Sequence, residues 1–157
     1  MKVSTKILIA TDGSADGTAA LDMACELMDP EATAVKVVSS YVATYQTTGE
    51  PTFLPAQCLE PVDRQLRQLA ADIVEDAASR IRSRFPDVDL TTETTPGEPD
   101  IEIVELAALW GADLIVVGSH GYGLGPRSLG PVSDAVVHHA PCSVLVVRRG
   151  ADLGLDR

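Results

Sequence analysis

A glycine-rich segment near the carboxyl end of the chain has the residue types of a phosphate-binding loop. Five glycines fall within the thirteen residues from Gly118 to Gly130, and a short helical pattern follows at 131–140. Glycine lets the backbone approach a ligand closely, and the N-terminus of the following helix offers free N–H groups to an anion. Glycine-rich loops also occur simply to make turns, so the segment indicates phosphate binding without excluding that alternative.

Three polar residues near this segment are candidates for ligand contact, and each has a second interpretation. Asp12 follows an apolar run at 6–11, where an Asp either meets a ligand or caps its own loop. His120 lies inside the glycine-rich segment and either contacts the ligand or is simply exposed. Arg127 is the only Lys or Arg of the segment. Its guanidinium fork fits a phosphate, although a solvated side chain explains it equally well.

The elements that would position these residues follow from hydrophobic periodicity. Apolar runs of strand length alternate with segments whose apolar residues recur every three or four positions. This alternation predicts a parallel, doubly wound α/β sheet with helices on both faces, in one domain over residues 1–150 followed by a flexible tail at 151–157. The predicted strands span 6–11, 34–42, 88–94, 113–117 and 143–148, the predicted helices span 15–28, 61–84, 99–110 and 131–140, and a long loop is predicted at 43–60.

The charge balance narrows the classes of partner. The 157 residues include 12 Lys and Arg against 23 Asp and Glu, a formal net charge of -11, and no basic run interrupts the acidic surplus. Nucleic acids and anionic membranes need clustered positive charge, so neither is an expected partner. A bound nucleotide needs only a few local N–H groups and is compatible with an acidic protein.

Cysteine usage and the amino terminus predict a cytoplasmic protein. Cys25, Cys58 and Cys142 lack the paired spacing of a zinc site or a redox dithiol, so we expect reduced thiols, with Cys25 and Cys142 buried. The first residues enter an apolar strand without a signal pattern, and no apolar stretch approaches the roughly 18 to 20 residues of a membrane helix.

Two stretches of the sequence resemble the universal stress protein family. They are ILIATDGS near the start and the run from ADLIVVGSHGYG to LGPVSDAVVHHAPCSVLVVRR, so that the resemblance covers nearly the whole chain. It implies a Rossmann-like, five-stranded sheet in the order 3-2-1-4-5, of the adenine nucleotide alpha hydrolase-like type, in a homodimer formed through the last strand, Ser143 to Arg148. In that order strands 1 and 4 are neighbours where the winding reverses, which is where open α/β sheets bind ligands.

The resemblance also implies a set of nucleotide contacts. Family members that bind ATP carry two glycines three apart, nine intervening residues, and then Gly followed by Ser or Thr. Asp12 would contact the adenine or ribose, and the main chain around Ser40 would border the base, while the glycine-rich segment would surround the ribose and phosphates, with Mg²⁺ accompanying the phosphates. The implied nucleotide-binding residues are Ala10, Asp12, Ser40, Gly118, His120, Gly121, Arg127, Gly130, Val132 and Ser133.

The sequence departs from that motif at two positions, which leaves two functions open. Only eight residues separate Gly121 from Gly130, and Pro131 stands where Ser or Thr is expected. Proline removes a hydroxyl and an N–H, and the donors that remain for a phosphate are the Val132 and Ser133 amides and the Ser133 hydroxyl. The chain is therefore either a stress-response regulatory protein that binds ATP, ADP, AMP or cyclic AMP, or a nucleotide-independent, dimeric, partner-binding stress protein.

Fast catalysis is not expected. The sequence shows no base, nucleophile and metal ligand that would be expected to lie together in one site. The turn after the first strand also lacks the phosphate loop of related nucleotide-binding enzymes. At most we expect slow hydrolysis of bound ATP. The remaining partner would be an unknown regulatory protein.

Overall fold

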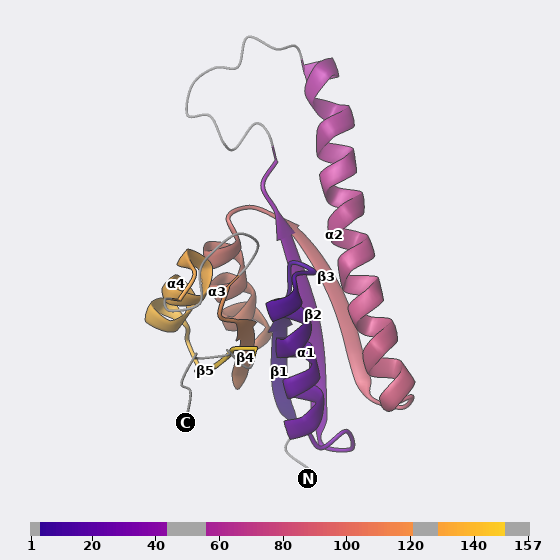
Figure 1. Cartoon of the computed structure of the whole chain (residues 1–157), viewed down its shortest axis with the longest axis vertical. Coiled ribbons are helices and arrows are strands. Elements are labelled where there is room, and N and C mark those ends of the chain that lie inside the picture. Colours follow the sequence, from indigo (N-terminus) through magenta and orange to yellow (C-terminus); the bar gives the residue numbers. More distant parts are fainter. Residues whose placement is uncertain (1–3, 44–55, 121–128, 150–157) are drawn as a thin grey trace, which may run out of the picture.

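The computed structural model describes residues 4–43, 56–120 and 129–149, which form one five-stranded sheet flanked by helices (Figure 1). All strands are parallel and the sheet order is β3-β2-β1-β4-β5, as the sequence predicts. The predicted tail at 151–157 lies outside the described residues. The strands are β1 (Thr5–Ala10), β2 (Thr33–Tyr41), β3 (Asp89–Pro96), β4 (Leu114–Gly118) and β5 (Ser143–Val147), and the helices are α1 (Ala15–Leu27), α2 (Ala56–Arg84), α3 (Pro99–Trp110) and α4 (Pro131–His139).

Each face of the sheet has its own apolar core. Side chains alternate between faces along a strand, so Ile7 and Ile9 of β1 pack under α1 and α2, while Leu8 and Ala10 pack under α3 and α4. Leu8 and Ile9 are both fully buried. A strand buried on both faces needs the continuous apolar run that the sequence has here.

Helix ends follow from local chemistry. Ser14 is the N-cap of α1, and its hydroxyl accepts a hydrogen bond from the Gly17 N–H at 3.2 Å. Pro99 begins α3, where a missing N–H costs nothing, and Gly111 ends it with a left-handed φ of 72°.

Most boundaries lie within one residue of those predicted, and the two larger differences both involve prolines. The sequence predicts that α2 begins at Pro61, but the helix begins at Ala56 and contains Pro61, which shortens the predicted loop 43–60. Proline at this position removes one i→i−4 hydrogen bond, and because only five residues of the helix precede it, the loss is confined to the first turn. The predicted third strand stops before Pro96, whereas β3 includes it, because β3 is an edge strand with one side free of ladder bonds.

Two further expectations concern the thiols and membrane helices. Cys25 is buried as predicted, whereas Cys142 is only half-buried, and the cysteines of the described residues are free thiols. Every helix in the described part of the chain is too short or too polar to cross a lipid bilayer.

Candidate functional site

A pocket of about 220 Å³ opens at the carboxyl ends of β1 and β4. It lies where the sheet order reverses, between the loop after β1, the start of α3 and the start of α4. Eight of the ten residues predicted for a nucleotide site line it, and the other two, Gly121 and Arg127, lie outside the described residues. The eight are Ala10, Asp12, Ser40, Gly118, His120, Gly130, Val132 and Ser133.

One wall of the pocket is apolar, and sequence reasoning found only part of it. Val38, Ile103 and Val117 are buried and line it, together with Pro99 of α3. A concave, mostly apolar surface with a few polar groups is the usual form of a small-molecule site. The helix itself was predicted, but its contribution to the pocket was not. Its inward residues indicated packing against the sheet and gave no separate sign of a ligand.

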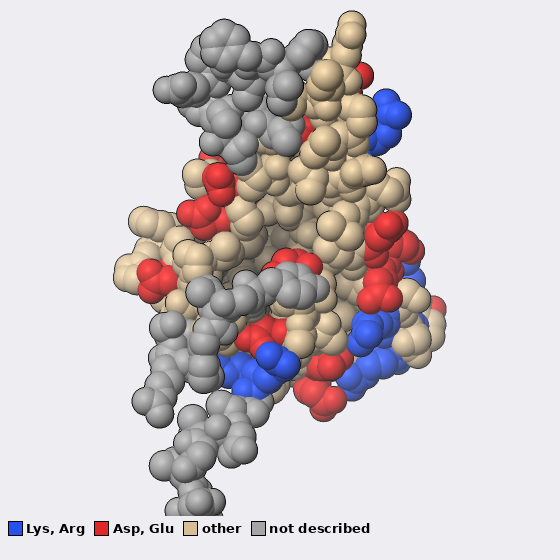
Figure 2. Space-filling model, turned by 45° about the horizontal axis from the view of Figure 1, so that its top comes forward, with Lys and Arg blue, Asp and Glu red and all other residues tan. Residues whose placement is uncertain are grey.

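Lys and Arg are missing from the pocket lining among the described residues. On the face shown in Figure 2, most of the basic side chains lie in the lower part of the view, and acidic side chains also occur near its centre. An anion in the pocket would therefore depend on backbone N–H groups and on His120 more than on fixed cations.

Asp12 caps its own loop, which was the second of its two interpretations. Its Oδ1 accepts a hydrogen bond from the Ser14 N–H at 2.9 Å, and the neighbouring Thr11 hydroxyl accepts one from the Gly13 N–H at 3.1 Å. Because Asp12 also lines the pocket, the turn and a ligand contact are compatible.

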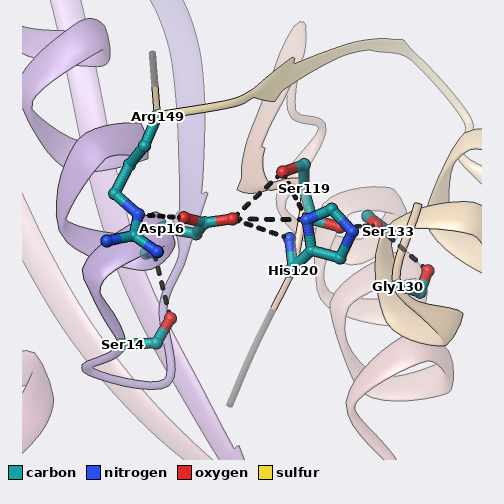
Figure 3. A network of polar contacts seen from close by, with 8 residues as sticks. Ser14, Asp16, Ser119, His120, Gly130, Ser133 and Arg149 are labelled. Atoms are coloured by element: carbon teal, nitrogen blue, oxygen red, sulfur yellow. Dashed lines mark hydrogen bonds and ion pairs between the residues drawn. The ribbon is translucent and has the colours of Figure 1, made fainter. Parts of the chain in front are cut away.

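The strongest polar feature is a buried carboxylate that sequence reasoning did not single out. Asp16, in the first turn of α1, has a side chain that is only 8% exposed. Its Oδ1 accepts a hydrogen bond from Arg149 Nε at 2.5 Å, and its Oδ2 accepts from Ser119 Oγ at 3.0 Å and from the His120 N–H at 3.1 Å (Figure 3). Asp16 thus joins α1, the segment after β4 and the segment after β5. The sequence signal was a carboxylate in the first turn of a helix that starts at the ligand-binding edge.

These contacts set the charge state of Asp16. Burial raises the pKa of its carboxyl, but the hydrogen bonds from Arg149 and Ser119 and the charge of Arg149 outweigh that effect, and the pKa lies below its ordinary value. Asp16 is therefore ionised at neutral pH and holds its three donors as a carboxylate.

Gly118 has a packing reason to be glycine. A Cβ at this position would lie 2.7 Å from the backbone carbon and oxygen of Asp16, a distance that real Cβ atoms do not reach. The glycine lets the first turn of α1 press against the end of β4, and its backbone also lines the pocket. Gly118 therefore has a role in packing in addition to its predicted role beside a ligand.

The start of α4 differs from the expected phosphate cradle. The Gly130 N–H donates to the Ser119 carbonyl at 2.8 Å, and Pro131 has no N–H. The Ser133 hydroxyl, expected to face a phosphate, is buried and lies 2.8 Å from the Ser119 carbonyl and 3.1 Å from the Gly130 carbonyl. The donors left for an anion are the N–H groups of Val132 and Ser133, which have no acceptor within the helix.

His120 is the one side chain here with an unpartnered buried nitrogen. Its side chain is 9% exposed, and its Nδ1 lies 2.9 Å from Ser119 Oγ and 3.5 Å from Asp16 Oδ2. Nε2 is buried without a hydrogen-bond partner among the described residues. The imidazole lines the pocket, so it is neither simply exposed nor satisfied by the fold.

A model of the universal stress protein family matches residues 4–148. The chain belongs to this family. It is 32% identical over 148 residues to the universal stress protein YxiE of Bacillus subtilis, an alignment that covers 91% of this chain and 98% of YxiE.

Solved structures of family members share the fold. Universal stress protein UspA from Lactobacillus plantarum superposes with a TM-score of 0.72 at 26% identity, covering 92% of this chain and 97% of UspA. A universal stress protein in complex with cAMP has a TM-score of 0.65 at 23% identity, covering 93% of this chain and 98% of that one.

We expect Asp16→Asn to destabilise the protein at neutral pH by about 2 kcal/mol, the range for losing hydrogen bonds to a charged group. Urea denaturation measures this. Because the folded pKa of Asp16 is lowered, its stabilisation is present above the unfolded pKa of about 3.9 and is lost as pH falls through the folded value. The deficit of the variant should therefore shrink in acid.

The matched control is Asp22→Asn, which changes an exposed carboxylate on the same helix. It should change the free energy of unfolding by less than about 0.5 kcal/mol. Equal stabilities of wild type and Asp16→Asn at neutral pH would contradict the role assigned to this carboxylate.

Proposed function

We propose that this protein is a stress-response regulatory protein that binds an adenine nucleotide in the pocket at the ends of β1 and β4. The observation that carries the proposal is that eight of the ten residues implied by the family resemblance line one pocket. The pocket joins an apolar wall to a helix N-terminus, which suits a ligand with an apolar ring at one end and an anion at the other.

The two ends of the nucleotide would meet different parts of the pocket. The adenine would lie against Val38 and Ile103, and Oδ2 of Asp12 would accept a hydrogen bond from the base or the ribose. The phosphate would lie at the start of α4, near the Val132 and Ser133 amides. Solved family structures in complex with cAMP, AMP and dAMP support an adenine nucleotide as the class of ligand.

Among adenine nucleotides, we place those with one phosphate ahead of ATP. The pocket volume of about 220 Å³ falls below the roughly 300–1,000 Å³ of drug-sized sites. Two of the expected donors, the Gly130 N–H and the Ser133 hydroxyl, already serve main-chain carbonyls. No group of three His, Cys, Asp or Glu within residues 4–43, 56–120 and 129–149 could hold a metal ion, so any Mg²⁺ would be bound through the phosphates and water. We propose a binding protein of the cytoplasm with at most slow ATP hydrolysis.

The internal hydrogen bonds of Gly130 and Ser133 favour one alternative, a nucleotide-independent dimer that binds a regulatory protein. Both functions share a proposed homodimer through Ser143 to Arg148. In its support, β5 pairs only with β4 in the sheet, and Val144, Leu145 and Val146 are half-buried. An apolar edge strand of this kind favours pairing with a second copy.

Calorimetric titration with AMP, cyclic AMP, ADP and ATP tests the nucleotide proposal. We expect binding of AMP or cyclic AMP, and we expect Val132→Trp to abolish it by filling the pocket. Val137→Trp, on the 45% exposed outer side of the same helix, should bind as the wild type does. Absence of heat with every nucleotide at millimolar concentration would reject the proposal in favour of the alternative. An equal loss in both variants would contradict the assigned place.

Sedimentation at micromolar concentration tests the dimer. We expect a two-subunit mass, because pairing satisfies the free N–H and C=O groups along β5 and covers its apolar side chains. A monomer would contradict the proposed interface while leaving the nucleotide proposal intact.

A further inference from the structure

The Asp16 network fixes which nitrogen of His120 carries a proton. The hydroxyl of Ser119 donates to Asp16 Oδ2 at 3.0 Å, so the same oxygen is left to accept from Nδ1 of His120 at 2.9 Å. Nδ1 is then the nitrogen that carries the hydrogen in the neutral ring, and Nε2 is left with a lone pair. The Asp16 carboxylate is linked to the ring through the Ser119 hydroxyl, and its Oδ2 also lies 3.5 Å from Nδ1.

The other edge of the ring faces the proposed phosphate position. Figure 3 shows Nδ1 turned toward Asp16 and Ser119, and the opposite side of the ring turned toward Ser133 and Gly130 at the start of α4. His120, Gly130 and Ser133 line the same pocket. Nε2 is buried and unpartnered among the described residues, so a ligand that offers it a hydrogen bond is favoured over one that does not.

The charged groups near His120 come from several elements of the fold. Asp16 of α1 is balanced by Arg149, which follows β5, at 2.5 Å. Asp12 lines the pocket from the loop after β1, whereas the lining residues of α3 and α4 carry no titratable group. A phosphate at the Val132 and Ser133 amides would add the negative charge that stabilises an imidazolium.

We propose that His120 is a specificity-determining residue of this pocket, which takes up one proton from solvent when an adenine nucleotide binds and donates a hydrogen bond from Nε2 to its phosphate. The inference rests on the proposed nucleotide function. Adenosine, which has no phosphate, should bind more weakly and without proton uptake. No covalent bond forms or breaks, and the proton returns to solvent when the nucleotide leaves.

Titration calorimetry with cyclic AMP tests this, because its phosphodiester keeps a single negative charge between pH 5.5 and pH 8, whereas the second proton of AMP titrates near pH 6. We expect roughly tenfold or greater tightening from pH 8 to pH 5.5, the effect of one hydrogen bond to a charged group. Titrations at neutral pH in buffers of different ionisation enthalpy should report net proton uptake on binding. Adenosine should show neither effect. The wild-type measurements need no variant to fold.

His120→Gln should bind cyclic AMP without pH dependence, because its amide N–H lies near the Nε2 position and does not titrate. His138→Gln, which changes an exposed histidine on α4, should keep the wild-type profile. Binding of cyclic AMP that does not change with pH, or that weakens in acid because Nε2 accepts a hydroxyl, would overturn the role of His120 and leave the nucleotide proposal standing. If neither cyclic AMP, AMP nor adenosine binds at any pH, both proposals fall.

Discussion

A single buried carboxylate holds together the three segments that meet at the carboxyl edge of the sheet. Asp16 begins α1, yet its oxygens accept hydrogen bonds from Ser119 and His120 after β4 and from Arg149 after β5. Burying a charge costs free energy unless the charge is paired and hydrogen-bonded. The fold is therefore most stable when these donors lie against the Asp16 carboxylate. The position of His120, and with it one wall of the pocket, depends on this arrangement.

The pocket exists because backbone segments approach closely at the same edge. Gly118 lets the first turn of α1 touch the end of β4, and Gly17 does the same against the loop after β1, where a Cβ would lie 2.6 Å from Thr11 Oγ1. Helix α1 packs on one face of the sheet, and α3 and α4 enclose the pocket on the other face. His120, which follows the end of β4, is thus positioned by a helix that packs on the opposite face of the sheet.

Most of the fold could be predicted from the sequence, because its apolar periodicity is strong and local. Residue types alone led to the glycine-rich segment, the helix start that follows it, Asp12 and His120, whereas the full set of eight pocket residues came from the resemblance to the universal stress protein family. The link between Asp16 and Arg149 spans 133 positions and leaves no local pattern, so it could not be read in advance. The inward direction of the Ser133 hydroxyl was also beyond prediction, because it depends on where Ser119 places its carbonyl.

If the nucleotide binds between the ends of β1 and β4, the backbone amides that line this pocket should respond to it. A ¹H–¹⁵N NMR titration of the full chain with AMP can detect this, because each backbone amide reports its own surroundings. We expect the largest shift changes at Gly118, Val132 and Ser133. A second hollow lies between α1 and α2, lined by Thr18 and Ile73 among others. Changes centred there, or no changes at saturating AMP, would contradict the account.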